Sequence, residues 1–267
     1  AAEDPKRFNV LVHRQIEEML AEDPACCLIG EDLLHPYGGA FKVSRDLSLR
    51  FPQQVRSAPI SEAAIVGMAI GLALAGHRSI AEIMFGDFMT LTLDQLLQHA
   101  SKFVSMYGRR VPLPLVVRTP MGGRRGYGPT HSQSIEKHFL GIPDLRVVAL
   151  NRRCPPRAVY AAVRSSAEPV LIIENKVLYT RHWESGSPVG FSMELSSDAF
   201  PVVRMRPGAA RHDVTIVCYG GMMESVEAAA LAAFDEHEVI CEVLCPSLLH
   251  PLDIEPIAES VRRSGRI

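Results

Sequence analysis

The feature that most constrains the fold is the alternation of strand-like apolar runs with segments of helical spacing. The runs are short, are rich in Val, Ile and Leu, and cover residues 25–31, 79–85, 113–119, 145–150 and 169–175. Apolar side chains recur at helical spacing between them, in residues 7–21, 61–76 and 93–107. This alternation predicts an α/β fold with a largely parallel sheet whose strands are covered on both faces.

The segment SEAAIVGMAIGLALAG at 61–76 predicts a helix with well-defined ends. Ser61 is a candidate N-cap, and Gly76 is a candidate for the residue that follows the C-terminus. The body of the helix is almost wholly small and apolar, so we expect it to be buried on every side.

A second α/β unit follows a break in this pattern. Residues from about 180 to 211 are rich in Ser, Pro and Gly, which is typical of a connecting segment. A strand is then expected at 213–221, a helix at 225–234, a strand at 238–245 and a helix at 254–263. We therefore expect a first domain at 1–180, a linker at 181–212 and a smaller domain at 213–267. The smaller domain is expected to be partial, because the pattern calls for a further strand where the sequence stops.

Composition excludes several classes of function. The formal net charge is -2, which gives no electrostatic footprint for nucleic acid or for an anionic membrane. No window approaches the roughly 18 apolar residues of a membrane span, and the first residues do not resemble a signal peptide. The six cysteines form no CxxC pair and lie mostly in apolar runs, as core residues do in a reducing compartment. We expect a cytoplasmic or organelle-matrix protein.

Glu62 is the most informative polar residue. It lies in the first turn of the helix expected at 61–76, where a carboxylate could simply complement the helix dipole. However, a carboxylate among so many Ala, Ile, Leu and Gly residues risks burial without a partner. A ligand that shares a proton with it is one way to satisfy it.

Two further segments follow predicted strands, where α/β sheets usually present ligands. The first, PMGGRRGYGPTHSQS at 120–134, contains His131 in a glycine-rich loop; the alternative is a flexible surface loop with a solvated histidine. The second, MFGDFMTLTLDQ at 84–95, places Met84 and Phe88 around Gly86-Asp87, and core packing is the simpler explanation for these two residues. The chain has no Gly-Asp-Gly metal motif and no glycine-rich phosphate loop.

Taken in order, these segments resemble one family. The stretches GEDLLHPYGGAFKVSRDLSLRFP, SAPISEAAIVGMAIGLALAG, AEIMFGDFMTLTLDQLLQHASKF and PMGGRRGYGPTHSQS are similar to β subunits of thiamine-diphosphate-dependent 2-oxo acid dehydrogenase E1 components, of the pyruvate, branched-chain and acetoin type. PVLIIENKVLY and HPLDIEPI continue the match, which covers most of residues 5–265. The resemblance implies a transketolase-like pyrimidine-binding domain followed by a smaller domain of the transketolase C-terminal type.

The resemblance also implies roles for five residues. Glu62 matches the glutamate that bonds N1′ of the cofactor's aminopyrimidine and controls its protonation, while the cofactor supplies the reactive carbon. Phe88 matches the aromatic residue that stacks on the pyrimidine, and Met84 matches a neighbouring wall residue. Glu31 matches an acidic residue of the same pocket. His131 matches the histidine that handles the intermediate or the incoming lipoyl group.

Partners and ions follow from the same resemblance. In the family, the α subunit holds the diphosphate and its Mg²⁺ through the Gly-Asp-Gly motif that is missing here, so we expect no metal ligands in this chain and an active site shared in an α2β2 heterotetramer. A second β subunit and an acyltransferase core are further expected partners. Family members bind a monovalent cation near the region matching 162–167, but RSSAEP departs from the usual spacing by one inserted residue.

Two alternatives stay open at this point. The chain could be a fragment of a transketolase or deoxyxylulose-phosphate synthase relative, with an upstream Gly-Asp-Gly domain. It could also be a non-catalytic β-like scaffold, although the joint presence of Glu62, Phe88 and His131 argues against this.

Overall fold

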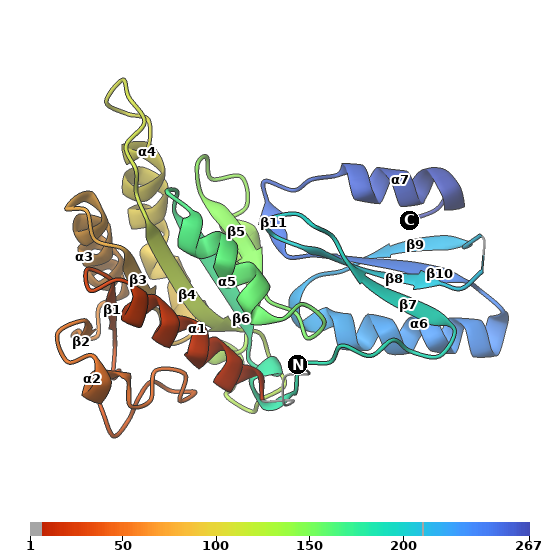
Figure 1. Cartoon of the computed structure of the whole chain (residues 1–267), viewed down its shortest axis with the longest axis horizontal. Coiled ribbons are helices and arrows are strands. Elements are labelled where there is room, and N and C mark those ends of the chain that lie inside the picture. Colours follow the sequence, from red (N-terminus) through yellow and green to blue (C-terminus); the bar gives the residue numbers. More distant parts are fainter. Residues whose placement is uncertain (1–6, 210) are drawn as a thin grey trace.

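The computed structural model describes residues 7–209 and 211–267; the first six residues, part of the segment in which we expect no signal peptide, lie outside them. In the described residues a seven-stranded sheet has the order β11-β5-β6-β4-β3-β1-β2. Its strands are β1 (Cys27–Gly30), β2 (Val55–Ser57), β3 (Ser79–Glu82), β4 (Leu115–Met121), β5 (Arg146–Ala149), β6 (Val170–Asn175) and β11 (Leu248–His250). All neighbours are parallel except β11 and β5. The predicted α/β fold with a largely parallel sheet is therefore confirmed (Figure 1).

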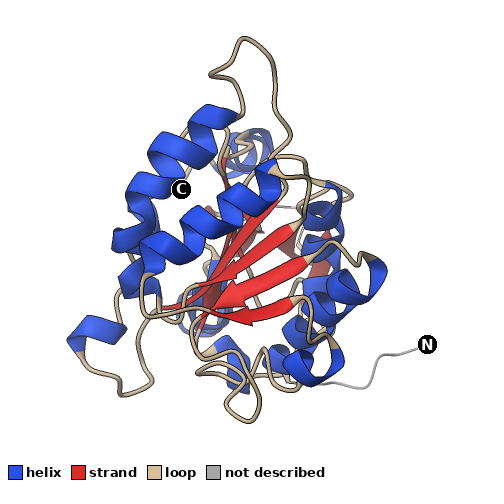
Figure 2. Cartoon of the chain, turned by 90° about the vertical axis from the view of Figure 1, so that its left-hand side faces the viewer, coloured by secondary structure: helices blue, strands red, loops and turns tan. Residues whose placement is uncertain are grey.

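Helices cover both faces of this sheet (Figure 2). They are α1 (Phe8–Glu22), α2 (Leu47–Arg50), α3 (Glu62–Leu74), α4 (Ser101–Phe103) and α5 (Pro156–Ser165), with the short helices η1 (Gly86–Thr92), η2 (Gln95–Ala100), η3 (Pro129–His131), η4 (Glu136–His138) and η5 (Leu178–Thr180). The helix expected at 93–107 is π-helical over η2 and α-helical only over α4.

Successive residues of a strand contribute side chains to two separate hydrophobic cores. Val116 packs with α1 and α5 on one face, whereas Val117 packs with α3 on the other. The side chains of a strand alternate between the two faces of a sheet, so a strand that is buried on both faces needs a continuous apolar run. This is why the parallel strands could be recognised from sequence.

The helix α3 differs from our expectation. It is buried only on the face that packs on the sheet, because Met68 and Leu74 are 45% and 42% exposed. An apolar composition does not by itself set which faces of a helix are covered; that depends on the neighbours that the chain provides.

The segment 181–212, expected to be a linker, contains two strands. β7 (Phe191–Leu195) and β8 (Val202–Pro207) join β9 (Val214–Val217) and β10 (Cys241–Pro246) in a second sheet of order β7-β8-β10-β9. β8 alternates buried Val203 and Met205 with half-exposed Arg204 and Arg206. An antiparallel strand buried on one face has this period of two instead of a continuous apolar run, so the search for apolar runs missed it.

Three helices complete the second unit, and one strand connects it to the first. The helices are η6 (Gly220–Met222), α6 (Met223–His237) and α7 (Glu255–Ser264), and α6 and α7 lie on opposite sides of the second sheet (Figure 1). β11 leaves the second unit to pair with β5, and the Ala149 N–H donates to the Ser247 carbonyl at 2.8 Å. The large sheet is thus completed by residues from the end of the chain.

Two expectations from composition can be compared with the described residues. Five of the six cysteines are buried and Cys27 is partly buried, and all of them are free thiols. No helix in the described part of the chain has the length and apolar character needed to cross a membrane.

Candidate active site

The predicted site residues follow the carboxyl ends of neighbouring parallel strands. Glu31 comes directly after β1, Glu62 follows β2, Met84 and Phe88 follow β3, and His131 follows β4. These strands are adjacent in the order β4-β3-β1-β2. The sheet therefore presents all five residues at one edge, which is where α/β sheets bind ligands.

Glu62 begins α3, and its side chain is nearly buried. Its side chain is 7% exposed, and among the described residues no hydrogen-bond donor and no cation contacts the carboxylate. Ser61 occupies the N-cap position in an extended conformation but makes no side-chain capping bond. The Ala58 N–H donates to the Gly30 carbonyl at 2.9 Å and ties this helix start to the end of β1. The carboxylate oxygens of Glu62 are therefore free to accept a hydrogen bond from a ligand.

Glu31 lies near this carboxylate. Burial, followed by the charges of Asp32 and Glu62, raises the pKa of the Glu31 carboxyl above its ordinary value. The two neighbouring carboxylates repel each other when both are ionised. A ligand that carries a proton, or shares one with a carboxylate, would relieve this repulsion.

Phe88 and His131 meet on an aromatic wall. The ring of His131 lies edge-on to Phe88, with centroids 5.2 Å apart, and to Phe85, with centroids 4.8 Å apart. Tyr127 adds a further edge contact to Phe85 at 5.5 Å. Phe88 is carried by η1, which packs on α3, so the aromatic wall and Glu62 belong to adjoining elements. Met84 is half-buried just before Phe85, but no contact between Met84 and the aromatic wall is seen in the described residues.

Hydrogen bonds join the two ends of the loop that carries His131. The Gly122 N–H donates to the Gln133 carbonyl at 3.1 Å, and the Gln133 N–H and side-chain amide donate to Asp87 Oδ1 at 3.1 and 2.8 Å. Gly122 has φ +90°, and a Cβ there would lie 2.7 Å from the Asn175 amide nitrogen, so only glycine fits. Thr130 Oγ1 lies 2.9 Å from Nδ1 of His131, and a proton donated by the hydroxyl would leave the ring proton on Nε2.

A buried ion-pair network supports the carboxyl edge. The Arg118 guanidinium is 1% exposed and pairs with Glu82 and Glu174, and its Nε donates to Glu174 at 2.8 Å. Burial alone lowers the pKa of Arg118, but Glu174 and Glu82 raise it well above its usual value. Tyr179 bonds to the same Glu174 carboxylate and contacts Phe41 at 5.3 Å between ring centroids. The network therefore anchors Tyr179, which contacts Phe41, and Phe41 in turn contacts the rings of Phe85 and Tyr127.

Sequence reasoning missed three residues of this site. They are Phe85 and Asp87, which lie within the segment 84–95 but were not named as candidates, and Lys176. Lys176 follows directly after β6, next to β4 in the sheet. The sequence feature that could have identified Lys176 is its position at the carboxyl end of a buried strand, because the other candidates occupy the same position relative to the sheet.

The described residues contain no group of three or more His, Cys, Asp or Glu side chains arranged to hold a metal ion.

Two family models match most of the chain. The transketolase pyrimidine-binding domain matches residues 8–181, and the transketolase C-terminal domain matches residues 205–267. The second match begins within β8, inside the segment that we expected to be a linker.

Named relatives agree with these matches. The chain is 31% identical to the β subunit of acetoin:2,6-dichlorophenolindophenol oxidoreductase of Cupriavidus necator, over 97% of this chain and 77% of that protein. It is 33% identical to the pyruvate dehydrogenase E1 component β subunit of Porphyra purpurea, over 94% of this chain and 73% of that protein. The human mitochondrial pyruvate dehydrogenase E1 β subunit is 31% identical, over 96% of this chain and 70% of that protein.

A solved structure agrees on the fold. A chain described as a split-gene transketolase in an inactive β4 tetramer superposes with a TM-score of 0.69 at 21% identity, over 98% of this chain and 78% of that one. The two family models, the named relatives and the fold lead to one conclusion: this chain belongs to the family of 2-oxo acid dehydrogenase E1 component β subunits, built from a transketolase-type pyrimidine-binding domain and a transketolase-type C-terminal domain.

Proposed function

We propose that this chain is the β subunit of a thiamine-diphosphate-dependent 2-oxo acid dehydrogenase, and that it supplies the aminopyrimidine half of an active site shared with an α subunit. The reaction is the oxidative decarboxylation of a 2-oxo acid with transfer of the acyl group to a lipoyl group. The observation that carries the proposal is the Glu62 side chain, which is 7% exposed and has no hydrogen-bond or ion-pair partner among the described residues. It lies on an element that adjoins the aromatic wall, at the carboxyl edge of a pyrimidine-binding domain.

The residues present fit an aminopyrimidine. The carboxylate of Glu62 can accept or share a proton at a ring nitrogen, and Phe88 offers an aromatic surface for a flat heterocycle. Glu31 and Met84 are proposed as further residues of the same pocket. When it is bound, thiamine diphosphate supplies the nucleophilic carbon that adds to the 2-oxo group, and the protein contributes placement and proton control.

His131 is proposed to act on the acyl group after decarboxylation. The ring is held edge-on to Phe85 and Phe88, so its plane is set, and its Nδ1 contacts Thr130. The remaining nitrogen is then available to donate or accept a hydrogen bond. A ring fixed in this way can assist a proton transfer when a lipoyl group arrives.

The diphosphate and Mg²⁺ are assigned to the α subunit. The described residues of this chain hold no metal-binding group of acidic, histidine or cysteine side chains, and the sequence has no glycine-rich phosphate loop. The α subunit would also provide most of the walls that select the 2-oxo acid.

The monovalent cation of the family does not fit the corresponding region of this chain. The Arg78 guanidinium donates to the carbonyls of Val163 and Ser166, both at 3.3 Å, at the C-terminal end of α5. A guanidinium thus already forms hydrogen bonds with carbonyl oxygens that a monovalent cation would otherwise coordinate. The side chains of Arg110 and Arg146 lie beside the same turn and pair with Glu168, so a further cation there would meet positive charge.

The partly exposed apolar face of α3 is proposed as part of the subunit interface. Met68 and Leu74 are exposed on this helix, and Ile60 just before it is 79% exposed. Apolar side chains gathered on one surface usually mark a protein interface. We propose an α2β2 heterotetramer with a β–β contact, and an acyltransferase core as a further partner.

The decisive experiment measures thiamine diphosphate binding by calorimetry in the presence of Mg²⁺, with the chain alone and with its α partner. Tight binding and decarboxylation of a 2-oxo acid are expected only for the mixture. Full activity of the chain alone would rule out the shared site, and no activity with any α partner would favour a scaffold.

A further inference from the structure

The side chain of Lys176 is unusual because it is a fully buried ammonium group with one hydrogen-bond acceptor. It is 0% exposed, and within the described residues the acceptor for Nζ is the backbone carbonyl of His131. Burial lowers the pKa of this lysine, and the negative charge of Asp87 opposes the effect. A buried cation with so few partners is costly, so its retention calls for a role.

The surroundings of Nζ belong to the proposed active site. Nζ lies 5.1 Å from the ring centroid of Phe85 and 5.7 Å from that of Tyr127. The ring of Phe85 also contacts the imidazole of His131, with centroids 4.8 Å apart. Lys176 therefore holds both the backbone of His131 and one of the rings that sets the plane of its imidazole.

Asp87 holds the same loop through hydrogen bonds with Gln133. Its Oδ1 accepts two hydrogen bonds from Gln133, whereas its Oδ2 is buried and has no hydrogen-bond partner in the described part of the chain. The loop of glycines at 122, 123, 126 and 128 has little intrinsic stiffness, so its end is positioned by these two charged groups.

We propose that Lys176 is a positioning residue for His131. Its buried ammonium group fixes the backbone carbonyl of the histidine, and its contact with Phe85 fixes the phenyl ring that packs against the imidazole. This proposal rests on the role proposed above for His131. It predicts that Lys176 affects the acyl-transfer step through the order of the loop, without contacting substrate or cofactor.

The test uses the complex of this chain with its α partner and two measurements. Hydrogen exchange of the peptide covering residues 122–134 reports loop order independently of any catalytic role. Decarboxylation with an artificial electron acceptor and acyl transfer to a lipoyl domain report the two half-reactions. Lys176→Met is the principal variant, since an apolar side chain of similar length should still fill the site and allow folding. Lys137→Met, at an exposed lysine just beyond the loop, is the matched control.

In Lys176→Met, the loop should exchange roughly tenfold faster, the order expected when one charge-assisted hydrogen bond is lost. Acyl transfer should fall more than decarboxylation, and Lys137→Met should match the wild type in every measurement. In Lys176→Ala, added ethylammonium should restore both loop protection and acyl transfer, whereas ethanol at the same concentration should not.

Unchanged loop exchange in Lys176→Met would overturn the proposal. So would faster exchange with both half-reactions intact, provided that His131→Ala is impaired in acyl transfer. If His131→Ala itself has normal acyl transfer, the proposed function of His131 fails and with it the catalytic part of this inference, while the exchange data still show whether Lys176 orders the loop.

Discussion

Glu31 and Glu62 follow neighbouring strands and are electrostatically coupled: the charge of Glu62 contributes, after burial and Asp32, to the raised pKa of Glu31. The pair lies at the start of α3 and the end of β1. Two carboxyl groups arranged in this way favour a partner that carries a proton, and this is the basis of the first prediction.

Glu62→Gln should reduce decarboxylation in the complex with the α subunit by roughly 10²-fold or more, as for other lost acid–base groups. The amide keeps the size of the side chain but cannot share a proton in the same way. The affinity for thiamine diphosphate should change much less, because the diphosphate contacts lie elsewhere. Steady-state kinetics and calorimetry on one preparation test this, and turnover near the wild-type level would exclude Glu62 from the reaction.

His131→Ala should separate the two half-reactions. If the imidazole acts on the acyl group, the variant should fold and bind cofactor normally, decarboxylate with an artificial acceptor, and fail in transfer to a lipoyl domain. If the ring only packs against Phe85 and Phe88, stability should fall modestly and both half-reactions should decline alike. Normal rates in both assays would remove His131 from the site.

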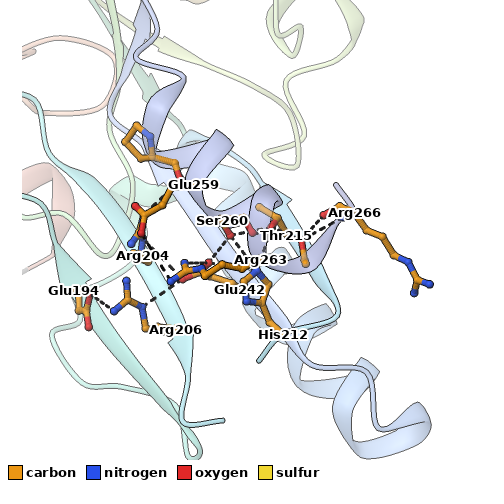
Figure 3. Close-up of polar contacts among 12 residues, drawn as sticks. Glu194, Arg204, Arg206, His212, Thr215, Glu242, Glu259, Ser260, Arg263 and Arg266 are labelled. Atoms are coloured by element: carbon orange, nitrogen blue, oxygen red, sulfur yellow. Dashed lines mark hydrogen bonds and ion pairs between the residues drawn. The ribbon is translucent and has the colours of Figure 1, made fainter. Parts of the chain in front are cut away.

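Glu242→Gln should destabilise the second domain. This carboxylate is 1% exposed, lies in β10, and contacts Ser260 and the guanidinium groups of Arg263 and Arg206 (Figure 3). Losing its charge leaves partly buried donors and positive charges unpaired, at a cost of about 2 to 3 kcal/mol at pH 7. Thermal unfolding measures the loss. Glu259→Gln is the control, since this side chain is 53% exposed and its ion pairs should contribute little.

The same carboxylate predicts a pH dependence. Burial alone raises the pKa of Glu242, but the hydrogen bond from the Ser260 hydroxyl and the charges of Arg263, Arg204 and His212 outweigh this effect, so that the net pKa lies below the ordinary value of 4.5. Its stabilising contribution is therefore present above about pH 4.5 and is lost as the pH falls through the folded-state pKa. The wild type should lose more stability than Glu242→Gln over this acidic range, and parallel losses would contradict the assignment.

The stability of the chain should not depend on potassium. Because Arg78 already bonds the carbonyls of Val163 and Ser166, the melting temperature should be the same in potassium chloride and in choline chloride of equal ionic strength. Arg78→Ala should lower stability by about 1 to 2 kcal/mol, as for other lost cations at a helix C-terminus, whereas Arg109→Ala, at an exposed arginine, should not. A clear rise in wild-type melting temperature with potassium would show that a cation binds.

Assembly should depend on the exposed face of α3. The chain should elute as a β–β pair or with its α subunit, and Met68→Glu should weaken that association because it places a charge among apolar contacts. Val189→Glu, at a residue that is 95% exposed in the second unit, is the control. A well-folded wild-type monomer at low concentration, measured by light scattering, would contradict the proposed interface.

The sequence by itself determined the fold class and the family. Continuous apolar runs identified the parallel strands, because strands buried on both faces need them, and the ordered motifs around Glu62, Phe88 and His131 identified the E1 β family. Local patterns carry this information because they depend on backbone period and on residue type.

Only the tertiary structure decided which groups meet. β8 was not predicted because a strand with one buried face has apolar residues only at every second position. The exposed face of α3 was not predicted because composition does not show which neighbours a helix has. The contact of Lys176 with the His131 carbonyl joins residues 45 positions apart, and that of Arg78 with Val163 joins residues 85 apart. Such pairings arise from the order of strands in the sheet, which brings separate loops to one edge and which no local pattern records.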